Sequence, residues 1–118
     1  MFLLQIIVIR FWGDSMIARI WHGRTKLSDK QEYRRFMLDR AVPDYKSTDG
    51  FVKLSFLQHD EGEVTHFTLI TYWENLEVIK NFAGEDYQTP KYYDKDKQFL
   101  LEFEDKVTHY EVFADEVL

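Results

Sequence analysis

The sequence contains no cysteine, and this absence removes a whole group of chemistries. Without thiols the chain cannot form a disulfide scaffold, bind an iron–sulfur cluster or a thiolate-ligated zinc ion, or use a cysteine nucleophile. Also absent are a glycine-rich phosphate loop, an HExxH motif and a GxSxG motif, so nothing in the sequence supports nucleotide binding, zinc-peptidase or serine-hydrolase activity. The lack of cysteine is compatible with a reducing compartment, and we expect a cytoplasmic protein.

Basic residues are also scarce. There are 15 Lys and Arg against 21 Asp and Glu, which gives a net charge of -6, and the densest basic cluster is the pair Arg34 and Arg35. Proteins that bind nucleic acid need clustered positive charges to displace counterions from the phosphates. We therefore expect no nucleic-acid partner.

Long apolar runs are missing as well. The most apolar stretch, residues 1–9, is too short to cross a bilayer, which needs about 20 residues, and it lacks the flanks of a secretory signal. We expect no membrane partner. We treat residues 1–15 as an N-terminal apolar extension, residues 16–114 as the folded domain and residues 115–118 as a C-terminal tail. A second methionine, Met16, opens the first patterned strand, so the sequence leaves open which methionine starts the protein.

What the sequence does contain is apolar and aromatic residues in quantity, 45% and 17% of its 118 residues. This length and composition indicate one folded domain with a substantial core. Bulky rings either fill such a core or line a cavity for flat apolar molecules, and composition alone does not distinguish the two.

Periodicity predicts the order of the elements. Alternating apolar residues predict strands over residues 16–22, 51–59, 64–73 and 106–113. Helical spacing begins after Ser28, which opens a capping-box pattern, and we expect the first helix to end at Pro43. A second helix follows the N-cap residue Asn75 and ends at Gly84, and a short helix is expected over residues 95–101. The result is a ferredoxin-like split βαβ sandwich of the α+β class, an antiparallel sheet with helices on one face.

The two faces of the predicted sheet differ in composition. With a loop at residues 60–63, Leu57 is expected opposite His66. The helix-covered face is then expected to carry Val52, Leu54, Phe56, Phe67, Leu69 and Trp73, and we assign Ala18, Ile20 and His22 to the same face. The uncovered face is expected to carry Ile17, Trp21, Leu57, Ile70 and Tyr72. Because apolar patches are rarely left in water, we predict a homodimer that packs sheet against sheet.

Four segments carry a resemblance to a known family. They are MIARIWHGRT, TYWENLEVIKNFAGED, YYDKDKQFL and VTHYEV, and together they extend from Met16 to about Phe113. These segments resemble the antibiotic biosynthesis monooxygenase family, whose members are dimeric α/β barrels built from ferredoxin-like halves. The resemblance implies this fold and a dimer, whereas chemistry varies widely among proteins that share a fold.

The resemblance implies two candidate chemistries. One oxidises polycyclic phenols to quinones with molecular oxygen and without metal or flavin, and the other opens haem with an Asn, Trp and His set. Trp73 matches the family's tryptophan at the end of the third strand, and His22 falls about where the asparagine would lie. No histidine follows the second helix, which argues against haem degradation by that route. We therefore expect a cofactor-independent monooxygenase that acts on a small aromatic compound. The alternatives are a non-enzymatic dimeric ligand-binding protein and a haem-binding protein.

Five residues are candidates for the site. We predict His22 as the base that accepts a phenolic proton and Trp73 as the ring that stacks on the substrate. Phe36, Tyr92 and Tyr93 are predicted to bind the substrate, and a tyrosine hydroxyl could form a hydrogen bond at the pocket mouth. The structural alternatives are that Trp73 packs as a core aromatic and that His22 is a satisfied buried histidine. A cavity there well below about 300 Å³ would favour the non-enzymatic alternative.

The remaining histidines suggest no metal site. His59 and His66 lie diagonally across the predicted hairpin, but metal sites need three or four converging ligands. We therefore predict no metal and no cofactor. His109 is expected beside them at the dimer interface, and the charge alternation at residues 94–97 is expected to be solvated surface.

Overall fold

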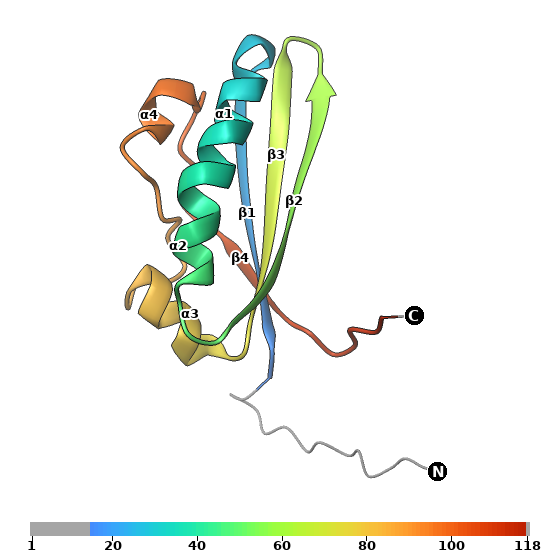
Figure 1. Cartoon of the computed structure of the whole chain (residues 1–118), viewed down its shortest axis with the longest axis vertical. Coiled ribbons are helices and arrows are strands. Elements are labelled where there is room, and N and C mark those ends of the chain that lie inside the picture. Colours follow the sequence, from blue (N-terminus) through green and yellow to red (C-terminus); the bar gives the residue numbers. More distant parts are fainter. Residues whose placement is uncertain (1–14, 118) are drawn as a thin grey trace.

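The sheet has four antiparallel strands in residues 15–117, which are the residues that the computed structural model describes. The elements are β1 (Ile17–Lys26), η2 (Leu27–Asp29), α1 (Lys30–Phe36), η3 (Met37–Ala41), α2 (Val42–Lys46), β2 (Phe51–Glu61), β3 (Val64–Trp73), α3 (Leu76–Ala83), α4 (Asp96–Phe99) and β4 (Thr108–Glu111). The strand order is β2-β3-β1-β4, and the helices lie on one face of the sheet (Figure 1). The predicted α+β, ferredoxin-like architecture is confirmed.

The predicted domain limits remain predictions. Apart from Ser15, the expected N-terminal extension lies outside the described residues, as does Leu118 at the end of the expected tail. Within residues 15–117, no helix combines the length and the apolar composition that a bilayer crossing requires.

The first helix differs from its prediction at both ends. Ser28 lies inside the first turn, and neither Lys26 nor Asp29, the residues at the N-caps, forms a side-chain capping bond. The helix also continues through Pro43 to Lys46. Proline lacks the N–H that an α-helix needs, but Pro43 is the second residue of α2, which follows the wider π-helical turn η3, so the missing N–H falls where the helical pattern changes.

This longer helix adds Tyr45 to the core. The Tyr45 ring is buried and stacks on Phe82 of α3, with ring centroids 4.8 Å apart. The N-terminus of α3 follows its prediction, because the Asn75 side chain accepts a hydrogen bond from the Val78 N–H at 3.0 Å. The helix ends at Gly84, whose φ of 95° suits glycine.

The β2–β3 hairpin turns more tightly than the sequence indicated. Glu61 pairs with Val64 across a turn in which Gly62 has a φ of 62°, so His59 lies opposite His66 and the predicted Leu57–His66 pair is wrong. A positive φ at glycine is what such short turns require. The slip is an even number of residues, so it moves no side chain to the other face.

A bulge in β2 changes which residue enters the core. The register shifts between Phe51 and Lys53, and Phe51 lies opposite Trp73 with ring centroids 5.1 Å apart. Val52 is the extra residue and is 45% exposed. The prediction that Val52 faces the helices is therefore wrong, because alternation cannot anticipate an inserted residue.

The faces of β1 are the reverse of the prediction. Ile17 pairs with Trp73 and Trp21 pairs with Leu69, so the odd-numbered residues of β1 face the helices. His22 pairs with Thr68 on the open face. Apolar residues occur on both sides of this central strand, so its alternation gave no unique choice of face.

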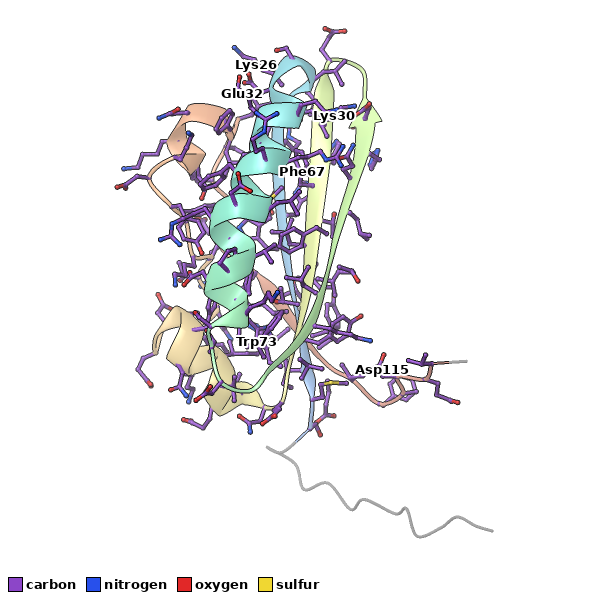
Figure 2. The ribbon with its side chains drawn as sticks, viewed as in Figure 1. Lys26, Lys30, Glu32, Phe67, Trp73 and Asp115 are labelled. Carbon is purple, nitrogen blue, oxygen red and sulfur yellow. The ribbon has the colours of Figure 1, made fainter. Side chains whose placement is uncertain are left out.

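The core lies between the helices and the covered face of the sheet, and Figure 2 shows Phe67 and Trp73 at two levels of this interior. Its buried members are Trp21, Tyr33, Met37, Ala41, Tyr45, Phe67, Leu69, Trp73, Ile79, Phe82, Phe99, Leu100 and Val107. Gly23 makes room for one of them, because a Cβ there would lie 2.4 Å from the Trp21 ring.

Candidate functional site

Trp73 is a core residue in this structure. The side chain is fully buried, and its rings lie 5.0 Å from Phe82 and 6.0 Å from Tyr45, centroid to centroid. The indole N–H donates a hydrogen bond to Thr71 Oγ1 at 2.9 Å. The ring therefore offers no free face to a ligand here, and its stacking role remains a prediction.

Two of the predicted substrate-binding residues do meet. The rings of Phe36 and Tyr93 pack edge to face with centroids 5.9 Å apart, and both line a cavity between the helices and the sheet. The volume of this cavity is about 20 Å³, far below the roughly 300 Å³ of ligand pockets. Tyr92 lies elsewhere, with its ring 5.0 Å from Phe103 and its hydroxyl donating to the Glu104 carbonyl oxygen at 2.9 Å.

Asp96 is a buried carboxyl group that the sequence did not indicate. It is 3% exposed, so the prediction that residues 94–97 are all solvated is wrong. The Tyr33 hydroxyl donates to Oδ1 at 2.7 Å, and the Tyr93 backbone N–H donates to Oδ2 at 2.6 Å. Burial raises the pKa of Asp96, because the charged carboxylate is poorly solvated there. The buried position of Tyr33 was the available signal, since its hydroxyl needed a partner.

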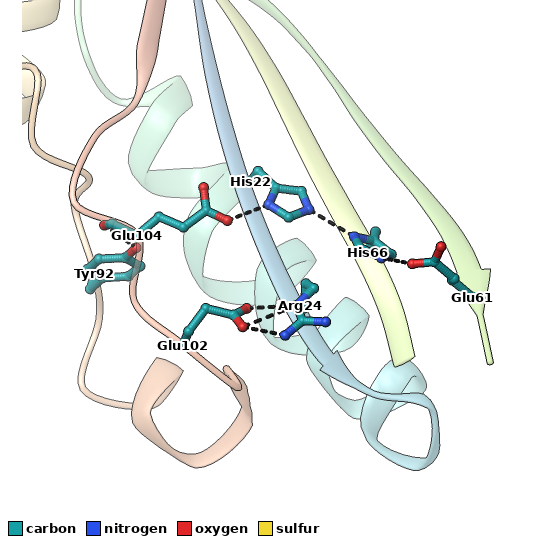
Figure 3. Close-up of polar contacts among 7 residues, drawn as sticks. All are labelled: His22, Arg24, Glu61, His66, Tyr92, Glu102 and Glu104. Atoms are coloured by element: carbon teal, nitrogen blue, oxygen red, sulfur yellow. Dashed lines mark hydrogen bonds and ion pairs between the residues drawn. The ribbon is translucent and has the colours of Figure 1, made fainter. Parts of the chain in front are cut away.

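His22 lies on the open face and not beside Trp73, which corrects our assignment of the two to one side. Figure 3 shows a polar chain that crosses three strands. His22 Nδ1 contacts Glu104 Oε2, His22 Nε2 lies 3.0 Å from His66 Nδ1, and His66 Nε2 lies 2.8 Å from Glu61 Oε1. We call these four side chains the His–Glu chain. His22 is thus only partly buried, and its role as a base remains a prediction.

Charged and aromatic neighbours flank the His–Glu chain. The Arg24 guanidinium pairs with the Glu102 carboxylate, with Nε 3.0 Å from Oε2. The His59 ring stacks on His66 at a centroid distance of 4.9 Å. Within residues 15–117, no three His, Asp or Glu side chains converge well enough to hold a metal ion.

A groove of about 590 Å³ lies beside β4, and we call it the β4 groove. Its lining residues are Ser15, Ile17, Leu76, Tyr87, Gln88, Lys106, Val107, Thr108, His109, Tyr110 and Glu111. His109 pairs with Arg19 across the strands on the helix-covered side, so its predicted place beside His59 and His66 is wrong. No feature of the sequence marked this groove.

A buried guanidinium lies behind the β4 groove. Arg19 is 3% exposed, and it donates to the carbonyl oxygens of Tyr87 and Thr89 and to His109 Nε2, which is 3.0 Å away. None of the ion pairs within residues 15–117 includes Arg19. Burial, followed by the nearby Arg19 charge, lowers the pKa of His109 to about 4, so its ring is neutral at pH 7.

Comparison with known proteins identifies the fold. No family model matches the sequence, and no curated protein matches it. Among solved structures, a protein from Nitrosomonas europaea assigned to the antibiotic biosynthesis monooxygenases has a TM-score of 0.62 and 12% identity, over 89% of this chain and 96% of that one. Another from Caulobacter crescentus with the same assignment has a TM-score of 0.63 and 12% identity, over 87% and 94%.

A third solved structure has a different name. A haem-degrading protein from Mycobacterium tuberculosis has a TM-score of 0.59 and 19% identity, over 86% of this chain and 99% of that one. Similarity at such low identity establishes the fold alone. The chain therefore has the fold of proteins assigned to the antibiotic biosynthesis monooxygenases, which confirms the resemblance at the level of structure.

Proposed function

We propose that this chain is a homodimeric protein that binds a small molecule in the β4 groove, and that it does not oxidise substrates between its helices and sheet. The contrast between two volumes carries this proposal. The cavity at Phe36, Tyr93 and Asp96 is about 20 Å³, whereas the β4 groove is about 590 Å³. Only the second lies within the range of about 300 to 1,000 Å³ that ligand sites occupy.

The open face of the sheet supports the dimer. Its apolar side chains include Leu57 and Tyr110, which are 50% and 54% exposed, and Ile20 and Ile70, which are partly exposed. None of the described helices covers this face (Figure 1). Apolar surface gains roughly 25 cal/mol per Å² when it leaves water, so packing against a second copy would stabilise the molecule.

Asp96 favours a second candidate function, cofactor-independent oxidation of an anthrone or hydroquinone. It lies beside Phe36 and Tyr93 in an aromatic setting, and burial raises its pKa, which makes its carboxylate a stronger base for a phenolic proton. The deprotonated substrate would pass electrons to molecular oxygen. For an anthrone, one oxygen atom becomes the new quinone oxygen and the other leaves as water. This candidate requires Phe36, Tyr93 and α4 to move apart, because the present cavity is too small.

Oxygen uptake tests the two candidates against each other. We would incubate the purified chain with a panel of anthrones and hydroquinones, and we expect no uptake above the protein-free rate. Uptake that disappears in Asp96→Asn, and persists in the control Asp94→Asn at an exposed neighbour, would instead establish the oxidase. A haem titration completes the test, because a Soret shift at one haem per protomer would contradict our proposal.

Sedimentation tests the dimer separately. We expect the wild-type chain to sediment as a dimer at micromolar concentration. Ile70→Glu should sediment as a monomer, because it places a charge in the middle of the apolar part of the open face. A wild-type chain that remains monomeric at millimolar concentration would exclude this assembly.

A further inference from the structure

We infer that the β4 groove binds a small apolar anion, such as an aryl carboxylate, with its charged end at His109 and its apolar body against Ile17, Leu76 and Val107. This inference rests on the proposed ligand-binding function and adds the class of ligand. Three observations carry it: an apolar groove of suitable size, a buried cation behind it that forms no ion pair within residues 15–117, and a histidine on its wall.

The cation is Arg19. Its described hydrogen-bond partners are two backbone carbonyl oxygens and an imidazole nitrogen, and all of these are neutral. A buried charge without an opposite charge is costly, and a nearby anion relieves that cost. Burial also lowers the pKa of Arg19, which reflects the same unfavourable solvation. An anionic ligand in the groove would therefore be attracted at close range and through a medium that screens poorly.

The donor is His109. A guanidinium can only donate hydrogen bonds, so the contact between Arg19 Nη1 and His109 Nε2 requires that Nε2 accept. The hydrogen of the neutral ring is therefore on Nδ1. His109 lines the groove, and in our proposal its Nδ1–H is the donor to the ligand. The positive charge of Arg19 on the opposite nitrogen makes that N–H a stronger donor. A carboxylate is the acceptor that gains most from such an N–H.

The charged side chains around the groove determine which end of a ligand lies near His109. Lys106 and Glu111 both line the groove, and Lys80 lies near it with Nζ 5.8 Å from the centre of the Tyr87 ring. The negative charge of Glu111 repels an anion at the end of β4 where Glu111 pairs with Ile17. The positive charges of Arg19 and Lys106 outnumber it, so the groove favours a single negative charge over a neutral ligand of equal size.

Two probes of the same shape test the inference. 1-Naphthoate and 1-naphthylmethanol differ in charge but have similar apolar bodies, and each would be titrated into the full-length chain while backbone amide shifts are followed by NMR. We expect shifts at residues 106–111 with both probes. Naphthoate should bind at least about tenfold more tightly, as a charge-assisted hydrogen bond implies.

His109→Phe should abolish this preference, because it retains a ring of similar packing and removes the donor. Arg19→Met should reduce the preference as well, and His59→Phe, on the other face of the sheet, should leave it intact. The ratio of the two affinities is the readout, since partial unfolding of a variant lowers both affinities together.

The outcomes separate the two claims. Equal affinity for both probes at residues 106–111 overturns the anion inference and leaves the ligand-binding proposal standing. Binding of neither probe, or shifts confined to the open face, overturns both. A naphthoate preference that survives in both His109→Phe and Arg19→Met also overturns the inference.

Discussion

The two faces of the sheet are built from the same strands and stabilised in different ways. On the covered face, Trp21, Leu69 and Trp73 belong to the core that packs against helix side chains, and the cavity lined by Trp21 and Leu69 is only about 20 Å³. On the open face, alternate residues of the same strands form the His–Glu chain and leave apolar groups in contact with solvent. A step of one residue separates Trp21 from His22, so within one protomer His22 and Trp73 lie on opposite faces of the sheet. The covered face supplies stability, and the open face and the β4 groove remain available for partners.

Two neighbours on β3 provide the largest expected contrast. Leu69 is 4% exposed on the covered face, and Ile70 is partly exposed on the open face. Leu69→Ala should lower the free energy of unfolding by about 2 to 5 kcal/mol at any protein concentration, because it leaves a cavity. Ile70→Ala should lower the free energy of unfolding less in dilute solution and more as concentration rises, because only the proposed dimer would bury that side chain. Urea denaturation at two protein concentrations measures both.

Equal losses of unfolding free energy in Leu69→Ala and Ile70→Ala at low protein concentration would contradict the contrast between the two faces. A loss for Ile70→Ala that does not depend on concentration would contradict the dimer alone.

The covered face also contains His109, and the direction in which its titration changes stability can be predicted. His109 has a pKa of about 4 in the folded chain against 6.5 as its ordinary value, so between these values the unfolded chain binds more protons. Stability should therefore fall as pH is lowered from 6.5 towards 4, by at most about 3 kcal/mol and by less where solvent reaches the ring. Urea midpoints measured between pH 4.5 and 7 would show the slope. His109→Phe should reduce it, and Thr108→Val, a change without titration on the same strand, should not.

A slope that is unchanged in His109→Phe would show that burial and the Arg19 charge do not hold this ring neutral.

The smallest expected effect belongs to the open face. Four ring nitrogens form the three contacts of the His–Glu chain: one with Glu104, one with Glu61, and one between the rings at 3.0 Å. Each contact needs one hydrogen between its two atoms.

His66→Gln should therefore lower the free energy of unfolding by less than about 1 kcal/mol, because contacts between partly exposed charged groups contribute little. Urea denaturation measures this loss. Glu102→Gln removes the neighbouring pair with Arg24 and leaves the His–Glu chain intact, so it serves as the control. A loss of several kcal/mol in His66→Gln would contradict the small effect expected on the open face.

The sequence predicted the element order and the faces of β3, because strict alternation along that strand leaves one solution. The predictions failed where the face or the burial of a residue depends on segments that lie far away in the sequence. In β1 both parities are apolar, so only the pairing with β3 decides that Trp21 is covered and His22 is open. Asp96 and Arg19 acquire their burial from contacts with Tyr33 and with Tyr87, far along the chain. Local patterns contain no information about such partners.

The strand order also has a consequence for the time course of folding. The β2–β3 hairpin is local and has a tight turn at Gly62, so it can form within roughly 1 to 10 μs. The central strand β1 pairs with β3 and β4, and both follow it at long distance in the sequence. Closing those long loops is entropically costly and slow. We therefore expect the hairpin to act as the template, and both the core around Trp21 and the His–Glu chain to assemble only when β1 joins it.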